Sequence, residues 1–546
     1  MKDKIIQRPT VDEISYCDLD ANDRNLVEHA LKQGFSRRQV LKLMMATGVT
    51  MTAASNIFTT GGQAMAQTPK KGGKIKFCSD IHGPNDQMDP VLFTSGIDYT
   101  RGRATYNSLV QHDEFIVPQP ELAEEFSPNA DATEWTFKLR KGVVWHDGSP
   151  FTADDVVWSM NRHMGEDSKS VVKAVIESVT EWKKIDSYTV KAILSSPNAD
   201  IATILGMFQF KIVKKDTVDF AKGIGTGPYT LTSFEPGVGS THKRNENYWR
   251  DGANLDEVEI FAITDTVARV SALISDDVQL AQSIDPKAIR QVEAADNVDL
   301  LSVPGGKYMG FVNMKNTLPG SNDDFVKGMQ YIQRRDKIVK SFLKGHGTVG
   351  NDQPINAAYG TDHCSELAQR PFDPDKAKSY FKKAGINSAE IHLAEITAGI
   401  GDATLLMQRE LSKIGFDLSI KKVPNDGYWG AVWMKTPINV VTWNMRPTAN
   451  SMLSIAFAPG AAWNDTQWNN DRMGELLVSS RGETDPAKRH QMYCEMQTLV
   501  NEECGMVIPA HSNYIDGKSK KLHGVPKVPL GQMGASEWPE FVWLDA

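Results

Sequence analysis

Alternating apolar and polar residues predict strands in several parts of the chain. The segment "KGGKIKFCSDI" (residues 71–81) opens with glycines and then alternates, and "EWTFKLR" (residues 134–140) alternates more regularly. Trp135, Phe137 and Leu139 fall on one face of the second segment, because successive side chains of a strand point to opposite sides. We therefore predict a strand there with one face on a core and the other in water.

Capping residues predict where helices begin. In "HDGSPFTADDVVWSMNRHM" (residues 146–164), Asp147 and Gly148 form a turn signal, and Thr152 and Asp155 have the spacing of a capping box. No nucleophile accompanies His146 and Asp147, so a turn is favoured there over a catalytic pair. We predict a helix after Thr152 that buries its apolar side chains, Val156, Val157 and Met160.

Two later segments carry both a start and a stop signal. Asp373 and Asp485 are predicted N-caps, each is followed by a proline at the first helical position, and Gly385 and Gly505 are predicted to end the helices. Strands and helices alternate along the chain without a fixed repeat. This order predicts mixed α/β domains.

Length and charge narrow the class of protein. The chain has 546 residues, of which 40% are hydrophobic, so we expect two to four domains with substantial cores. The formal net charge is -8, with both signs interspersed and no basic stripe. A nucleic-acid partner is therefore not expected.

The cysteines predict neither a zinc site nor a local disulfide. Of the five, Cys17 precedes the segment discussed next, and the other four form no C-x-x-C pair. Cys494 and Cys504 lie ten residues apart in one predicted helix, a span of about 15 Å that is too long for a bond between them. We predict that both are core cysteines.

Residues 1–66 are predicted to be an export signal. Residues 36–42 read "SRRQVLK", and a moderately apolar run and the cleavage-type triplet Ala64-Met65-Ala66 follow. The run of about 16 residues is shorter than the roughly 20 that cross a bilayer. The segment resembles a twin-arginine signal, which implies export of the folded chain by the twin-arginine translocase, cleavage near Ala66 and a periplasmic product without a lipid anchor.

Residues that resemble motifs of nucleotide or metal sites lack the flanking elements or the spacing that such sites require. "GHGTVG" (residues 345–350) has dinucleotide-site spacing, but a helical pattern precedes it and Pro354 follows, so we predict a helix end and a loop. Four histidines lack ligand spacing, namely His82, His112, His146 and His163. No catalytic residues, metal or cofactor are predicted from the sequence.

Several stretches resemble one family in their order along the chain. "PELAEEF" is followed by "WTFKLRKGVVWHDGSPFTADDVVWSMNR", and later by "GTGPYTLTSFEPG" (225–237), "RNENYWRDGANLDEVEI" (244–260), "RPFDPDKAKSYFKKAG" and "EMQTLVNEECGMVIP". Together they resemble the extracytoplasmic solute-binding proteins of family 5, the dipeptide-, oligopeptide- and nickel-binding components of ABC importers. The resemblance runs from about residue 72 to the end.

The resemblance implies an α/β, two-lobe periplasmic binding protein fold of the class II, or cluster C, type with an extra subdomain in lobe I. Lobe I would comprise residues 67–106, 223–305 and 508–546, the subdomain residues 107–222, and lobe II residues 306–507. The lobes would close on a ligand and present it to a membrane permease, which requires no catalysis.

The predicted ligand site departs from the dipeptide pattern. Dipeptide binders carry a W-x-x-D-x-x-D-P stretch in lobe II, whereas Trp443 is followed here by Asn444, Met445, Arg446 and Pro447. The region in which the family's carboxylate-binding arginine would lie, "HLAEITAGIGD", contains no arginine. Arg446 thus inverts the local charge, and a guanidinium beside aromatic rings suits a carboxylate or phosphate.

We expect Arg446 to bind an acidic group of the solute, with the remaining site residues being Trp443, Asn444, Tyr428, Trp429, Tyr308 and Trp463. Alternatively, Arg446 pairs with an acidic neighbour in its lobe or reaches solvent. Tyr308 fits a hinge or core position equally well, and Trp463 could close a loop. The favoured ligand is a peptide or a peptide-like acidic solute such as an opine or sugar acid. The alternatives are a nickel or haem carrier and, third, an exported enzyme.

Overall fold

The computed structural model describes residues 69–425, 428–483 and 485–545, and Lys70–Ala546 form one compact unit. The predicted export signal, residues 1–66, lies outside these ranges. None of the helices in them combines the length and the apolar character that a bilayer span requires.

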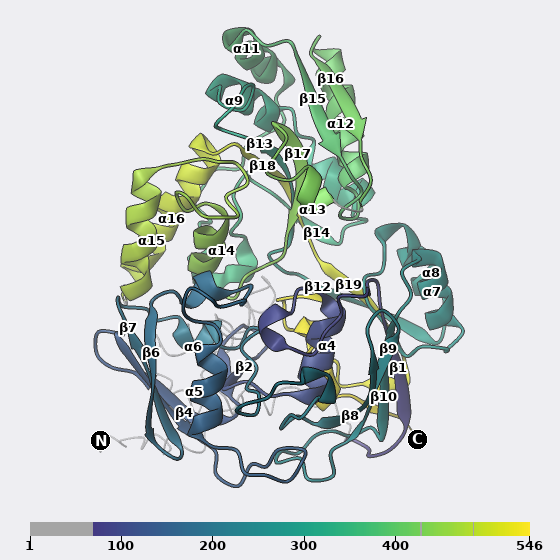
Figure 1. The fold of residues 1–546 in the computed structure, drawn as a ribbon. Coiled ribbons are helices and arrows are strands. Elements are labelled where there is room, and N and C mark those ends of the chain that lie inside the picture. Colours follow the sequence, from purple (N-terminus) through teal and green to yellow (C-terminus); the bar gives the residue numbers. More distant parts are fainter. Residues whose placement is uncertain (1–68, 426–427, 484, 546) are drawn as a thin grey trace, which may run out of the picture. The chain divides into compact units, whose positions relative to one another are not determined.

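Lobe I is built on a seven-stranded sheet (Figure 1). Its strands, in spatial order, are β12 (Val298–Val303), β19 (Tyr514–Ser519), β11 (Leu280–Ala281), β1 (Lys74–Ser79), β10 (Glu257–Ala262), β9 (Gly239–Arg244) and β8 (Tyr229–Glu235). The predicted first strand is confirmed as β1, which runs parallel to both of its neighbours. The helices of this lobe include α4 (Gly96–Thr105), α7 (Thr266–Ile274) and α8 (Ile289–Glu293).

A four-stranded antiparallel sheet forms the subdomain between β1 and β8. Its strands are β4 (Ala123–Pro128), β5 (Glu134–Leu139), β7 (Thr189–Leu194) and β6 (Val179–Asp186). The predicted one-sided strand is confirmed, because Trp135, Phe137 and Leu139 of β5 are all buried. Helix α5 (Ala153–Asn161) begins with the predicted capping box, in which the Thr152 N–H donates to Asp155 Oδ2 over 2.9 Å.

Lobe II is built on a six-stranded sheet with helices on both faces. Its strands are β14 (Gly347–Val349), β18 (Met506–Ser512), β13 (Tyr308–Asn313), β17 (Ile438–Trp443), β15 (Ser388–Leu393) and β16 (Asp417–Lys422). One core contains side chains of α9 (Asp323–Tyr331), α11 (Pro374–Ala384) and α12 (Ile400–Lys413). The other contains side chains of α14 (Ala449–Ala456), α15 (Asp471–Gly482) and α16 (Pro486–Glu503).

The predicted helix caps are confirmed with one exception. Asp373 accepts the Lys376 N–H, and Gly385 ends α11 with a left-handed φ of 69°. Helix α16 starts after Asp485, but Gly505 does not end it. A Cβ on Gly505 would lie 1.8 Å from the Asn313 carbonyl oxygen, so close approach to β13 is what excludes a side chain there.

Two adjacent connections join the lobes. Val303 pairs with Tyr514 at the end of the β12–β19 ladder, and Tyr308 pairs with His511 at the start of the β13–β18 ladder. Strand β18 spans residue 508, at which the return to lobe I was expected, so the chain returns only after Ser512. The two connections are held together by the Ser512 N–H, which donates to the Lys307 carbonyl over 2.8 Å.

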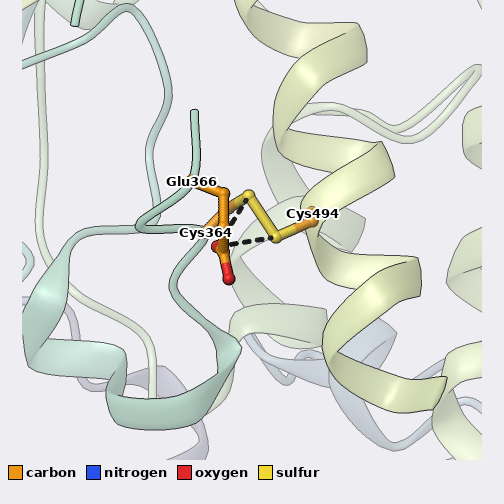
Figure 2. A group of neighbouring side chains, drawn as sticks. All are labelled: Cys364, Glu366 and Cys494. Atoms are coloured by element: carbon orange, nitrogen blue, oxygen red, sulfur yellow. Dashed lines mark hydrogen bonds between the residues drawn. A yellow bond between two sulfur atoms is a disulfide. The ribbon is translucent and has the colours of Figure 1, made fainter. Parts of the chain in front are cut away.

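The prediction that Cys494 is a core cysteine is wrong. Cys494 forms a disulfide with Cys364, at a Cα–Cα distance of 4.8 Å and a sequence separation of 130 (Figure 2). Cys504 is buried with a free thiol, as predicted, and Cys78 is likewise free and buried. The missed pair connects α16 to the loop after η7 (Ala357–Asp362), two segments that no local pattern relates.

Candidate functional site

Arg446 follows β17 and is half-buried, with most of its donors free. Its backbone N–H donates to the Tyr359 hydroxyl over 3.2 Å, and its Nη1 donates to the Asn444 carbonyl over 3.4 Å. Its Cζ lies 5.8 Å from the Trp443 ring centroid, within the range of a cation–π contact. Within residues 69–425, 428–483 and 485–545, no carboxylate oxygen lies within 4.0 Å of the guanidinium. The alternative of an ion pair inside the lobe is therefore not observed.

Four tyrosines, two from each lobe, lie near enough to Arg446 for its charge to affect their pKa values. Tyr99 on α4 and Tyr514 on β19 belong to lobe I, whereas Tyr308 on β13 and Tyr359 on η7 belong to lobe II. Burial raises the pKa of all four hydroxyls, that of Tyr99 to about 12, and the positive charge of Arg446 opposes the rise in each. Arg446 is thus placed where the two lobes meet.

Next to Arg446 lies a tryptophan cluster that consists of Trp429, Trp433, Trp443 and Trp463. Centroid distances between contacting rings are 5.5 to 6.3 Å, and the rings meet at steep angles of 59° to 84°, which is favourable edge-to-face geometry. Trp429 is 47% exposed and Trp463 41%, whereas Trp443 is only 5% exposed. The two outer rings therefore offer aromatic surface to a ligand, and the inner rings support them.

A buried carboxylate orients the two inner rings. The indole N–H groups of Trp443 and Trp433 both donate to Oδ2 of Asp465, over 3.0 and 3.2 Å. Burial raises the pKa of Asp465 to about 6, and the indole hydrogen bonds oppose this rise. The sequence interpretation missed Trp433 and Asp465. The four-residue spacing of Trp429 and Trp433, typical of one helical face, was the available signal for the first of them.

The remaining predicted site residues have different surroundings. Tyr428 is buried, and its hydroxyl donates to the Val440 carbonyl over 2.8 Å. Tyr308 is also buried, and its hydroxyl has no hydrogen-bond partner among the described residues. Asn444 is exposed. In this conformation the accessible part of the predicted set is therefore Arg446, Asn444, Trp429 and Trp463.

Met445 connects the same segment to lobe I and to the crossing. Its backbone N–H donates to the Tyr514 hydroxyl over 3.2 Å, and its sulfur accepts the Gly306 N–H over 3.2 Å. Its side chain packs in one cluster with Val528 and Leu530, near the end of the chain. The residues on either side of Arg446 are thus held by both lobes, which gives the guanidinium a defined position.

Comparison with known proteins agrees with this architecture. The family model described as bacterial extracellular solute-binding proteins, family 5 middle, matches residues 117–465. The dipeptide-binding protein of Escherichia coli (strain K12) is 26% identical over 544 residues, covering 90% of this chain and 97% of that protein. Heme-binding protein A of Haemophilus influenzae is 22% identical over 536 residues, with the same coverage.

Solved structures match over nearly the same length. The periplasmic binding protein DppA from Helicobacter pylori, in complex with the peptide STSA, has a TM-score of 0.75 and 21% identity. The protein AgaA from A. tumefaciens R10, in complex with agropinic acid, has the same two values, and each match covers 87% of this chain and 99% of the other. These likenesses confirm the predicted α/β, two-lobe periplasmic binding protein fold with its extra subdomain. The chain belongs to the bacterial extracellular solute-binding proteins, family 5.

Proposed function

We propose that the chain is the solute-binding component of an ABC importer, and that Arg446 binds a carboxylate of a peptide-like or opine-type solute. One observation carries the proposal: a half-buried guanidinium contacts a single backbone carbonyl and no described carboxylate, and it lies over Trp443, an inner ring of a cluster with two exposed indoles. An arginine has five N–H donors in a planar fork that matches a carboxylate. A carboxylate on the ligand would use the donors that the protein leaves free.

The ligands of several relatives support this choice of solute class. DppA from Helicobacter pylori was solved with a peptide, AgaA with agropinic acid and MoaA with mannopinic acid. A peptide and an opine acid share a carboxylate and an extended polar body. Trp429 and Trp463 would cover that body, while Asn444 would donate to or accept from its polar groups.

The cellular setting follows from the family and from the sequence. The twin-arginine translocase would export the folded chain, cleavage near Ala66 would release it, and the closed form would dock on an ABC permease in the periplasm. Lobe closure on the solute replaces catalysis, so the chain is proposed to be a carrier and not an enzyme. Lobe I would comprise residues 67–106, 223–305 and the return after Ser512, with the subdomain at 107–222.

A thermal-shift screen of purified chain tests the proposal. The panel contains di- and tripeptides, opine acids, Ni²⁺–histidine and haem, because relatives are named for or solved with members of these classes. Sugar acids are added as further acidic solutes. A ligand at 100 times its dissociation constant adds about 2.7 kcal/mol to stability. We expect a carboxylate-bearing peptide or opine to give the largest shift, whereas a shift only with haem or nickel contradicts the proposed solute class.

Arginine variants then test the anchor. A hydrogen bond to a charged group contributes about 1.5–3 kcal/mol, so Arg446→Ala should weaken the best acidic hit by about 10- to 150-fold. Arg446→Lys should recover only part of this loss, because a point charge cannot form the bidentate contact. The matched control is Arg472→Ala, which removes an exposed arginine that pairs with Glu475 and Glu495. Equal affinities for wild type and Arg446→Ala would show that the anchor is elsewhere.

A further inference from the structure

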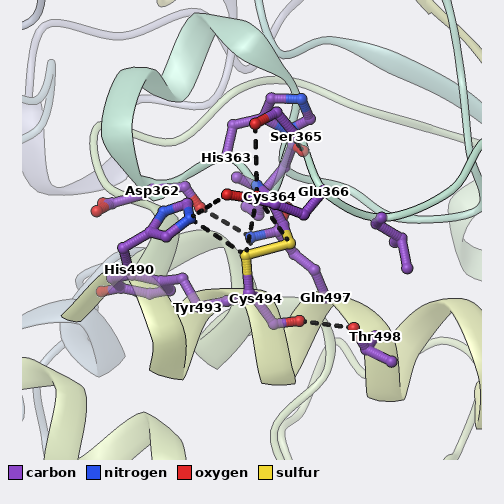
Figure 3. The surroundings of a disulfide bond; sticks show 12 residues. Asp362, His363, Cys364, Ser365, Glu366, His490, Tyr493, Cys494, Gln497 and Thr498 are labelled. Atoms are coloured by element: carbon purple, nitrogen blue, oxygen red, sulfur yellow. Dashed lines mark hydrogen bonds and ion pairs between the residues drawn. A yellow bond between two sulfur atoms is a disulfide. The ribbon is translucent and has the colours of Figure 1, made fainter. Parts of the chain in front are cut away.

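Four donor side chains from two segments meet at the disulfide (Figure 3), and Figure 2 draws three of them, Cys364, Glu366 and Cys494. Cys364 and Glu366 lie on the loop after η7, whereas His490 and Cys494 lie one turn apart on α16. The residues at positions i and i+4 of a helix share one face, so both α16 side chains point toward the loop. None of the four belongs to the tryptophan cluster or contacts Arg446.

The distances between these donors fit a tetrahedral metal site. Oε2 of Glu366 lies 3.6 Å from each sulfur, Nε2 of His490 lies 3.5 Å from the Cys494 sulfur, and His490 Nε2 lies 3.2 Å from Glu366 Oε1. Zinc–ligand bonds of about 2.0 to 2.3 Å give tetrahedral edges of about 3.3 to 3.8 Å. The sulfur–carboxylate distances and the Cys494–His490 distance therefore match edges of such a tetrahedron, and Cys364, Glu366 and Cys494 place one ligand atom each within 4.8 Å of the others. The two sulfurs must move apart on reduction to complete it, because they are bonded to each other in the disulfide.

The imidazole of His490 is oriented as a metal ligand. Its Nδ1 lies 2.7 Å from the Thr361 carbonyl oxygen, so a proton on Nδ1 is donated to that carbonyl. In the neutral imidazole this leaves the lone pair of Nε2 directed toward Cys494 and Glu366, whereas a protonated Nε2 donates to Glu366 Oε1 over 3.2 Å. Ligating histidines in metal sites are fixed in the same way, by a second hydrogen bond to a carbonyl or carboxylate.

We propose that the reduced form of this cluster binds one borderline-soft divalent cation of the Zn²⁺ class. The ligands are Sγ of Cys364, Sγ of Cys494, Nε2 of His490 and a carboxylate oxygen of Glu366. A thiol reductant supplies two electrons and two protons to the disulfide and itself becomes a disulfide. The cation then displaces the two thiol protons and is bound by two thiolates, an imidazole and a carboxylate, a donor set that suits zinc.

The disulfide and the metal exclude each other, because each uses both sulfurs. Both reactants can reach the cluster. The Glu366 side chain is 66% exposed and that of His490 29%, and a surface pocket is lined by Cys364, Glu366, Leu367, His490 and Cys494 among others. Sequence spacing does not predict this site, since its two cysteines are separated by 130 positions.

Cobalt titration of the full chain tests the proposal. The protein is reduced with dithiothreitol, desalted under nitrogen and titrated with Co²⁺. We expect a thiolate-to-cobalt charge-transfer band and tetrahedral d–d bands that saturate at one Co²⁺ per chain and vanish when Zn²⁺ is added. The oxidised protein should give neither band. Near-ultraviolet circular dichroism checks the fold, and a reduced chain that has lost its native spectrum and does not regain it with Zn²⁺ would overturn the proposal.

Variants assign the ligands. Cys364→Ser/Cys494→Ser should lose both bands. Any band that remains in this variant would come from cobalt bound by the other three cysteines. His490→Ala and Glu366→Gln keep the disulfide, and each should weaken cobalt binding by at least about tenfold. Gln491→Ala, an exposed neighbour on the same helix, is the matched control and should bind as wild type does. Unchanged binding in both His490→Ala and Glu366→Gln would overturn the assignment.

Discussion

The backbone N–H of Arg446 donates a hydrogen bond to the phenolic oxygen of Tyr359, 3.2 Å away. This contact connects the segment after β17 to η7. The loop that follows η7 is in turn bonded to α16 through Cys364. The position of the proposed carboxylate anchor therefore depends on a segment far from it in the sequence.

We predict that Tyr359→Phe weakens solute binding through this contact. The variant leaves the Arg446 N–H without its acceptor, which should lower the free energy of unfolding by about 0.5–1.5 kcal/mol and allow the guanidinium to move. Urea unfolding and calorimetric titration of the best hit measure the two effects. Tyr380→Phe is the control, because that hydroxyl forms no hydrogen bond with the described residues; an equal loss in both variants would contradict the prediction.

Asp465→Asn should change how stability depends on pH. Burial raises the pKa of Asp465 to about 6 from its ordinary 3.8. Between these two pKa values the native state keeps a proton that the unfolded state has lost. The stability that protonated Asp465 contributes is therefore fully present below the unfolded pKa and is lost as pH rises through the native pKa. Asparagine does not titrate. The free energy of unfolding of the variant, relative to wild type, should therefore rise by about 2 kcal/mol from about pH 4 to about pH 7.

Urea unfolding across this range measures the difference, and tryptophan fluorescence gives an independent readout. In the wild type, fluorescence should titrate near pH 6, because the titrating carboxyl accepts both indole N–H groups. This transition should be absent from Asp465→Asn. Asp251→Asn, at an exposed position, should retain it. A difference in stability that does not vary with pH would refute the assignment.

Gly306→Ala should destabilise the crossing between the lobes. A Cβ there would lie 2.8 Å from Tyr359 Cε2 and 2.9 Å from Met445 Cγ, so both side chains must shift. Overpacking of this kind costs about 1–3 kcal/mol, which urea unfolding measures. Gly83→Ala is the control, since a Cβ at that position would meet no described atom within 4 Å beyond its chain neighbours. Equal unfolding midpoints for the two variants would argue against tight packing at Gly306.

Loss of the Cys364–Cys494 bond should be costly because of the length of chain that it closes. The sequence separation is 130, and the chain-entropy model assigns about 4.7 kcal/mol to a loop of about 100 residues. Cys364→Ser/Cys494→Ser should thus lose up to about 5 kcal/mol in urea unfolding with a chelator present. Reductant should destabilise the wild type and leave this variant unchanged; a wild type insensitive to reductant would mean that the bond adds no stability.

Local patterns predicted the elements whose signals are local. The burial of Trp135 and Phe137 followed from period-two alternation, and the starts of α5 and α11 followed from Thr152 and Asp373, because a cap depends on residues within one turn. Gly505 has the position of a helix terminator but is required by contact with Asn313. Asn313 lies in β13, which is separated from Gly505 by almost all of the lobe II sequence. A local stretch of sequence therefore cannot reveal this requirement.

The candidate site was predicted in part for the same reason. Arg446, Trp443 and Trp463 were predicted as ligand-binding residues because charge inversion and aromatic residues are visible in the sequence, and the structure places Trp443 next to both of the others. Asp465 was missed because it lies between Trp463 and Trp468 in the sequence, whereas the indoles that donate to it are those of Trp433 and Trp443. Tyr99 was missed because its proximity to the charge of Arg446 comes from lobe I and requires the tertiary fold.

The pairing at the crossing has a consequence for chain architecture. Val303 pairs with Tyr514, and Tyr308 pairs with His511. The chain therefore leaves the seven-stranded sheet of lobe I for lobe II, and returns to it, at neighbouring points. Strands β12 and β19 are therefore the two arms of a β-hairpin whose turn has been replaced by an entire domain. Such an insertion can be excised and its neighbouring ends joined by a short linker, so lobe II is a natural unit for separate expression, grafting and circular permutation.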